Sequence, residues 1–342
     1  MSMPLTVLAA AWRWAIARGT RLWKIIVSLL GRWPTIATSQ IPPASTTTSA
    51  PPHHIIYRPI PGSWQRREHP NWPDSVFQIP QTAPYGTIYY ITKGKQIGGG
   101  ATAHVERLPS GHIVKSPKAN PYSPEEEHRH RRNMEIEAEV YRRMETCPHV
   151  PRLIDWDSDS CCLTLEYLVN GDLAAYLRQT AAAAARIPDE TRQRWTLQAA
   201  AALKALHAVN VIHCDLTPRN LFLDATLDLH VADFAGSSVD GSVPTIAAGP
   251  RFQRPGQRCT ADRSDDIFAL GSVIYFIMVG HEPYAELQEE EVEQLFSKAS
   301  FPDVSRLVCG ATIRRCWEGT LGTAEGAMES LHASYAGGSG AA

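Results

Sequence analysis

The sequence predicts an α+β fold for the region from residue 88 onward, on three observations. Short runs of β-forming residues, separated by turns that contain glycine or proline, occupy residues 88–115. An acidic segment, residues 124–144, follows with the periodicity of a helix. Finally, 44% of the 342 residues are hydrophobic, which provides for a substantial core and excludes a wholly disordered chain.

Charge divides the chain into two unlike parts. The net charge is only −2, but residues 1–87 contain eight basic and two acidic residues, which leaves 25 basic and 33 acidic residues for 88–342. The first part also holds 12 of the 25 prolines and six of the nine tryptophans. Because the second part is acidic and has no basic stripe, we expect no nucleic-acid partner.

Residues 1–33 are predicted to form a basic amphipathic helix. No acid occurs between residues 5 and 33, and on a helical wheel all five cations share one arc while Trp12 and Trp23 lie on the apolar side. This pattern suits a membrane surface, although it is equally typical of a mitochondrial transit peptide. An untargeted, weakly ordered extension is the third possibility. A membrane-spanning helix is not expected, because charges interrupt every stretch of about 18 residues.

Residues 34–87 are predicted to be a linker. They contain two Pro-Pro pairs, a run of serine and threonine at 45–49, and further isolated prolines. We therefore expect no packed core before about Ile88. All seven cysteines lie beyond this point, in odd number and without C-x-x-C spacing. This favours a reducing, cytoplasmic compartment over a disulfide framework or a zinc site.

The first motif is a glycine-rich hairpin. We expect a strand over residues 87–97, a turn at Gly98-Gly99-Gly100, and two further strands, the last of which ends at Lys115. Glycines allow a hairpin backbone to approach phosphate groups without a steric clash from Cβ. Because this turn does not open a helix, it matches neither the Rossmann fingerprint nor the P-loop.

The second motif requires three particular residues at fixed spacings. Asp215 stands five residues before Asn220, and Asp233 stands thirteen residues after that asparagine, with apolar strands on either side. Physically, this pattern supplies one carboxylate that can receive a hydroxyl proton, together with an Asn/Asp pair that can hold magnesium on phosphate oxygens.

With these residues the chain resembles the eukaryotic protein kinase family, whose H-R-D-x-x-x-x-N and D-F-G elements it matches with departures. The resemblance extends over residues 88–333. It implies one bilobal domain: an N-lobe (88–167) with a five-stranded antiparallel sheet and one helix, and a mainly helical C-lobe (168–333). The last residues, 334–342, are expected to form a disordered tail.

The resemblance also implies a catalytic site. Asp215 would be the catalytic base, Lys115 would hold the α- and β-phosphates, and Asn220 and Asp233 would bind the metal. We expect Glu137 to pair with Lys115, because Val140, Tyr141 and Met144 then share its inward face, with Glu139 as the fallback. The residues that would contact the nucleotide are Gly98, Gly100 and Ala103 at the positions of the three loop glycines, then Val105, Glu166, Leu168 and Asp172.

Several departures qualify the resemblance. Cys214 replaces the arginine that in this family pairs with a phosphorylated activation loop, so the nearby hydroxyl residues are poor candidates for obligatory switch sites. Thr217 replaces a lysine that acts on the γ-phosphate, and Arg219 could supply that charge instead. Asp266 matches the family's buried aspartate, which supports the catalytic loop.

The resemblance implies a protein kinase that uses ATP and Mg²⁺ to phosphorylate serine or threonine, with tyrosine left open as an acceptor. Its partners would be protein substrates, ATP and, through residues 5–33, a membrane surface. Two alternatives remain. One is a pseudokinase that acts as an ATP-binding or scaffolding module, which the departures favour, and the other is a small-molecule kinase.

Overall fold

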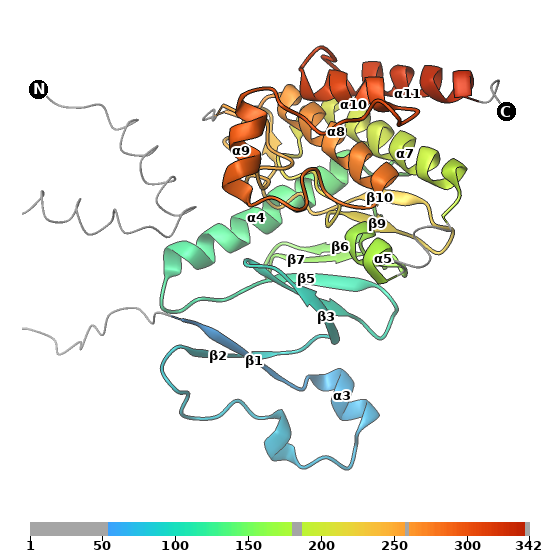
Figure 1. Ribbon diagram of the computed structural model, residues 1–342. Helices are drawn as coiled ribbons and strands as arrows, with labels where there is room; N and C mark the ends of the chain where they lie inside the picture. Colours follow the sequence, from blue (N-terminus) through green and yellow to red (C-terminus); the bar gives the residue numbers. More distant parts are fainter. Residues whose placement is uncertain (1–53, 180–186, 257–259, 339–342) are drawn as a thin grey trace, which may run out of the picture. The chain divides into compact units, whose positions relative to one another are not determined.

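The computed structural model describes residues 54–179, 187–256 and 260–338 (Figure 1). The amphipathic helix predicted for residues 1–33 and the first part of the predicted linker lie outside these ranges. Within them, no helix combines the length and apolar character needed to cross a bilayer.

A five-stranded antiparallel sheet with the order β3-β4-β5-β7-β6 forms the N-lobe. Its strands are β3 (Lys95–Gly99), β4 (Ala103–Arg107), β5 (Ile113–Pro117), β6 (Leu153–Asp157) and β7 (Cys162–Leu165). One helix, α4 (Pro124–Arg143), covers the sheet on the side of the C-lobe (Figure 1). Its first turn is capped by the Ser123 side chain, which accepts a hydrogen bond from the backbone of Glu126. The expected N-lobe sheet and helix are confirmed.

The C-lobe is mainly helical, as predicted. Its helices are α5 (Leu173–Gln179), α7 (Asp189–Ala208), α8 (Arg263–Val279), α9 (Glu289–Ser297), α10 (Gly310–Trp317) and α11 (Ala324–Gly338). Helix α8 is buried over most of its length, because its sequence from Ile267 to Ile277 is almost wholly apolar. Gly271 allows α10 to approach closely, since a Cβ there would lie 2.7 Å from the Cβ of Cys316.

Two short antiparallel pairs lie in the C-lobe on either side of the motif residues. Strand β8 (Val211–Ile212) pairs with β11 (Ser238–Val239), and β9 (Leu221–Leu223) pairs with β10 (Leu229–Val231). All but three of these ten residues are buried. The segments that carry Asp215, Asn220 and Asp233 are therefore held at both ends by packed strands.

The linker prediction for residues 34–87 is wrong for its second half. Strand β1 (Ile56–Ile60) pairs in parallel with β2 (Thr87–Ile91), and between them lie α3 (Ser63–Glu68) and the 3₁₀ helix η1 (Asp74–Phe77). The many prolines suggested a linker, but Pro59 stands in a two-stranded ladder, where an edge strand tolerates a missing donor. Ile60 is buried, so packing begins well before Ile88.

The strand predicted for residues 87–97 is in fact two strands. Thr92 directly follows β2, and its hydroxyl accepts from the backbone N–H of Gly62 at 3.1 Å. The chain then passes so close to β4 that a Cβ on Gly94 would lie 2.2 Å from the carbonyl oxygen of Arg107. Strand β3 starts beyond this crossing and joins the five-stranded sheet, whereas β2 pairs with β1 in a separate two-stranded sheet.

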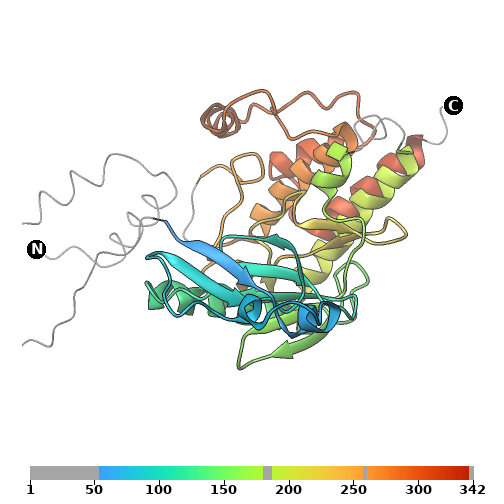
Figure 2. The same ribbon diagram turned by 90° about the horizontal axis from the view of Figure 1, so that it is seen from below.

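The boundary predicted at residue 333 also falls too early. Helix α11 continues to Gly338 and lies beside α7 (Figure 2). The Tyr335 hydroxyl is 2.7 Å from the Thr196 hydroxyl on α7. This tertiary contact, which has no signature in the local sequence, holds the last turns of the helix.

Candidate active site

Lys115 lies at the centre of a cluster of three charges. It sits on β5 opposite Val105 and Leu163, and its Nζ is 2.8 and 2.7 Å from the two carboxylate oxygens of Glu137. The same Nζ is 2.7 Å from Oδ1 of Asp233. Three elements distant in sequence therefore converge on one ammonium group.

Glu137 is the acid of α4 that reaches Lys115. Its side chain is fully buried on the inward face of the helix, together with Val140 and Tyr141. The fallback, Glu139, lies on another face, where it pairs with Arg143 at 2.9 Å. The helical periodicity of the sequence thus distinguished these two acids.

Electrostatics favour the charged forms of Lys115 and Asp233. Burial by itself would lower the pKa of Lys115, but the charges of Asp233 and Glu137 outweigh it and raise this pKa. The charge of Lys115 is the main reason why the pKa of Asp233 lies below its usual value. Burial raises the pKa of Glu137 to about 7, against the opposing effect of Lys115. A cation at Lys115 and an anion at Asp233 therefore persist at neutral pH.

The catalytic loop (residues 213–220) is held in place by Asp266 of α8. Its carboxylate accepts the backbone N–H of His213 at 2.8 Å and that of Cys214 at 3.0 Å, and it lies 2.9 Å from Nε2 of His207. Cys214 has a φ of +67°, a conformation that costs free energy for a residue with a side chain. The two N–H bonds to Asp266 hold the backbone in this conformation.

Asp215 and Asn220 are joined directly. The Nδ2 of Asn220 donates to the backbone carbonyl of Asp215 at 2.7 Å and to its Oδ2 at 2.9 Å. Burial raises the pKa of Asp215, which makes its carboxylate a stronger base. Arg219 is exposed, and its charge acts in the opposite direction on this pKa.

The donor set fits a magnesium ion. Because the amide nitrogen of Asn220 is committed to Asp215, its amide oxygen is the atom left to bind a cation. Asp233 uses Oδ1 on Lys115 and has a second carboxylate oxygen, with 48% of its side chain exposed. Oxygen donors are those that Mg²⁺ prefers, and one or two protein ligands suffice when phosphates complete the shell.

Phe234 connects α4 to the catalytic loop. Its ring is fully buried and meets the edge of Tyr141 at 5.0 Å between centroids, and it lies 5.3 Å from the ring of His213. The position of α4 and the position of the catalytic loop are therefore coupled through one packed aromatic cluster.

The predicted nucleotide contacts lie on β3, β4 and the connection after β7. Gly98 and Gly100 are exposed in the glycine-rich loop (residues 97–105), whereas Ala103 opens β4 and is buried. A methyl group at this third position is thus accommodated in the core. Val105 is half-buried opposite Lys115.

The connection after β7 carries the remaining predicted contacts. The backbone N–H of Glu166 donates to the carbonyl of Arg152 at 3.0 Å, and Leu168 is buried. Oδ1 of Asp172 accepts the backbone N–H of Ala175 at 2.8 Å, in the first turn of α5. That oxygen is committed to the helix, and a contact of Asp172 with the nucleotide stays a prediction.

Arg143 is a site residue that sequence reasoning missed. From the last turn of α4 it forms two bonds to Asp240, at 3.0 and 2.8 Å, and a third, at 3.1 Å, to the carbonyl of Val209. Asp240 directly follows β11 in the segment that begins at Asp233. No local pattern marks the pair, because its members stand 97 residues apart and meet only in the folded chain.

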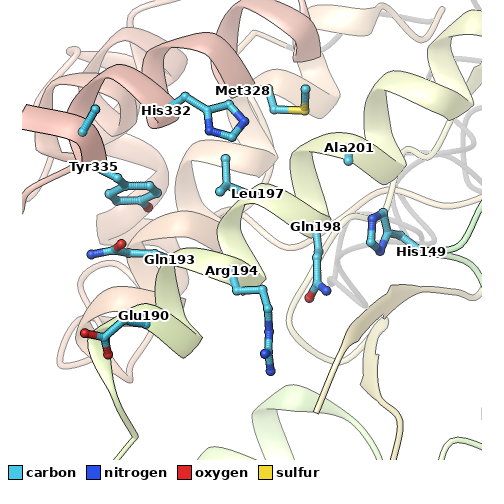
Figure 3. A pocket seen from close by; sticks show the side chains of 11 residues that line it. His149, Glu190, Gln193, Arg194, Leu197, Gln198, Ala201, Met328, His332 and Tyr335 are labelled. Atoms are coloured by element: carbon cyan, nitrogen blue, oxygen red, sulfur yellow. The ribbon is translucent and has the colours of Figure 1, made fainter. Parts of the chain in front are cut away.

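A separate hollow of about 610 Å³ lies between α7 and α11 (Figure 3). Its lining includes Arg194, Gln198, Met328 and His332, and none of the residues of the charge cluster or the catalytic loop. This hollow therefore has no part in the chemistry of the site.

Comparison with known proteins agrees with this geometry. The family model of the protein kinase domain matches residues 91–311. The chain belongs to this family. Membership implies the use of ATP with a divalent metal, and it explains why Lys115, Glu137, Asp215, Asn220 and Asp233 are brought together although they come from four separate segments.

The most similar curated relatives include serine/threonine kinases. The chain is 30% identical over 172 residues to serine/threonine-protein kinase ULK3 of Xenopus laevis, an alignment that covers 47% of this chain and 36% of the relative. It is 31% identical over 175 residues to Aurora kinase B of Drosophila melanogaster, which covers 49% of this chain and 51% of the relative. The chain thus spans about a third to a half of the length of these relatives.

Proposed function

We propose that this chain is a protein kinase that transfers the γ-phosphate of ATP to serine or threonine hydroxyls of proteins. The observation that carries the proposal is the complete set of chemical groups: the lysine of the charge cluster, the base Asp215, and the oxygen donors Asn220 and Asp233. Phosphoryl transfer depends mainly on positioning and electrostatic stabilisation, which these groups provide.

The groups have distinct tasks in the proposed reaction, and Asn220 has two of them. Lys115, kept charged by its two carboxylates, binds phosphate oxygens and is aimed by Glu137. Asp215 accepts a hydrogen bond from the acceptor hydroxyl and takes its proton, while Asn220 holds the carboxylate in place. Asn220 and Asp233 would hold Mg²⁺, which supplies charge neutralisation on the phosphates when bound.

Serine and threonine are proposed as acceptors because the relatives named above include a serine/threonine-protein kinase, ULK3 of Xenopus laevis. The sequence of the catalytic loop does not distinguish serine/threonine from tyrosine as the acceptor, because Thr217 and Arg219 stand at positions that often differ between kinase classes. A contact of residues 5–33 with a membrane surface also stays a prediction, since these residues lie outside the described ranges.

The test is phosphate transfer by the full chain with Mg²⁺ and labelled ATP on a generic protein acceptor. Asp215→Asn keeps the size of the side chain and removes the base, so it should lower transfer by about a hundredfold or more. Glu329→Gln, an exposed acid on α11, is the matched control and should leave the rate unchanged.

A pseudokinase would give a different result. Nucleotide would bind, as measured by calorimetry, but neither autophosphorylation nor acceptor labelling by the wild type would exceed that of Asp215→Asn. Labelling of a small metabolite but of no protein acceptor would instead identify a small-molecule kinase.

A further inference from the structure

The turn of the glycine-rich loop has few anchors of its own. Residues from Lys95 to Ala101 are exposed, and a Cβ on Gly100 would meet no atom within 4 Å. Within the hairpin the turn is closed by the bond from the N–H of Gly100 to the carbonyl of Ala103 at 3.2 Å. A loop of this kind needs contacts from elsewhere to hold one position over a nucleotide.

Lys118 supplies two such contacts. It follows β5 directly, three residues after Lys115, and is half-buried. Its Nζ donates to the carbonyl of Gly100 at 2.7 Å, and its backbone N–H donates to the carbonyl of Thr102 at 2.9 Å. The segment that positions the catalytic lysine is thereby tied to the loop that would cover the phosphates.

Lys118 is in turn held by the strand that precedes the kinase domain. Its Nζ lies 5.0 Å from the centroid of the Tyr57 ring, within the range of a cation–π interaction. The Tyr57 hydroxyl donates to the carbonyl of Ala119 at 3.0 Å, and Nδ1 of His130 on α4 lies 2.9 Å from the carbonyl of Lys118 itself. Strand β1 and helix α4 therefore restrain the lysine from two sides.

The same tyrosine also contacts the second strand of the loop. His104 on β4 is buried, stacks on Tyr90 of β2 with 3.9 Å between centroids, and meets Tyr57 edge to face at 5.2 Å. The two ends of the turn thus converge on one residue: the carbonyl of Gly100 through Lys118, and β4 through His104. Tyr57 lies outside the region that the family model matches, which begins at residue 91.

From this chain of contacts we propose that Lys118 and Tyr57 are positioning residues of the glycine-rich loop, so that the segment before the kinase domain sets the affinity for nucleotide. Lys118 restrains the loop through the Gly100 carbonyl, and Tyr57 restrains Lys118. This proposal rests on the proposed function for its kinetic consequence, but nucleotide binding measures it without any phosphate transfer.

The experiment uses the full chain and compares Lys118→Met, Lys118→Arg and Tyr57→Leu with Tyr85→Leu. The control removes an exposed tyrosine of the same segment, whose ring contacts Tyr122. Calorimetry gives the Kd for Mg²⁺ with a non-hydrolysable ATP analogue, and steady-state assays give KM for ATP and kcat. Circular dichroism confirms that each variant is folded.

We expect Lys118→Met and Tyr57→Leu each to raise Kd and KM about fivefold, the factor that corresponds to about 1 kcal/mol for a lost cation–π contact or charged hydrogen bond. The kcat at saturating ATP should change by less than about twofold. Lys118→Arg keeps the charge and the donors and should restore most of the affinity. The double variant should be little worse than either single one, because both residues act through the same contact.

Two results would overturn the proposal. One is an unchanged Kd in folded Lys118→Met. The other is a loss in Lys118→Met with none in Tyr57→Leu, which would mean that the lysine contacts phosphate directly. If the wild type binds the analogue but transfers no phosphate, the proposed function fails while the Kd comparison still decides this inference.

Discussion

His104 should make the folded state sensitive to acid. Burial, and to a lesser extent the charge of Lys118, lower the pKa of this histidine from 6.5 to about 4. The native state therefore binds this proton less readily than the unfolded state does. The stabilisation that neutral His104 gives to the folded state is complete above about pH 6.5 and is lost as the pH falls towards 4.

The structure sets the size of the effect. His104 is only 5% exposed, so solvent screens it little. With the two pKa values above, linkage predicts a loss of about 1.4 kcal/mol at about pH 5.5 and a limit of about 3 kcal/mol at lower pH. The other titratable groups around the ring are Tyr57, Tyr90, Lys118 and Glu106. Burial raises the pKa of Glu106, so its protonation in acid works in the opposite direction.

Comparison with a variant isolates the histidine from these other groups. His104→Phe keeps an aromatic ring between the two tyrosines but cannot titrate. Urea unfolding between about pH 7.5 and 4.5 should show the wild type losing more stability than this variant, by the amounts above. His128→Phe, at an exposed position of α4, should keep the wild-type dependence. Parallel pH profiles of wild type and His104→Phe would refute the reasoning.

Two further predictions concern the Arg143–Asp240 pair and the thiol of Cys214. Arg143→Gln and Asp240→Asn should each lower phosphate transfer severalfold, because the pair ties α4 to the segment after Asp233. Since both side chains are partly exposed, their coupling energy in a double-mutant cycle should be about 1 kcal/mol or less. Fully additive losses of activity would contradict the link. Burial, followed by the charge of Asp266, raises the pKa of the Cys214 thiol from 9.0 to about 12. Alkylation of this thiol at neutral pH should therefore be about a thousandfold slower than in the urea-unfolded chain. Peptide mapping measures the two alkylation rates, and equal rates would show that the thiol is not protected.

Much of the catalytic site could be predicted from local sequence. Asp215 and Asn220 stand five residues apart in one loop, so their spacing alone brings them together, and they are bonded in the structure. The helical period was enough to choose Glu137 over Glu139. In these cases the information is local, because backbone geometry determines which side chains share a face or a turn.

The elements around the site could not be predicted in this way. The prolines between residues 34 and 87 suggested a linker where β1 lies. The pairing of β1 with β2 also leaves no pattern in either strand, because these parallel strands are about 30 residues apart. The contacts of Lys118 with Gly100, and of Arg143 with Asp240, likewise depend on chain crossings that no spacing encodes.

The sequence by itself thus determined the family, the fold class and the identity of the groups that would carry out the chemistry. Only the tertiary structure decided how those groups are held. The lysine lies between two carboxylates, the backbone of the catalytic loop donates to Asp266, and the glycine-rich loop is tied to a strand outside the kinase domain. The physical reason is that catalytic chemistry requires particular side chains at short spacing, whereas support comes from packing and hydrogen bonds between distant segments, which many sequences can provide.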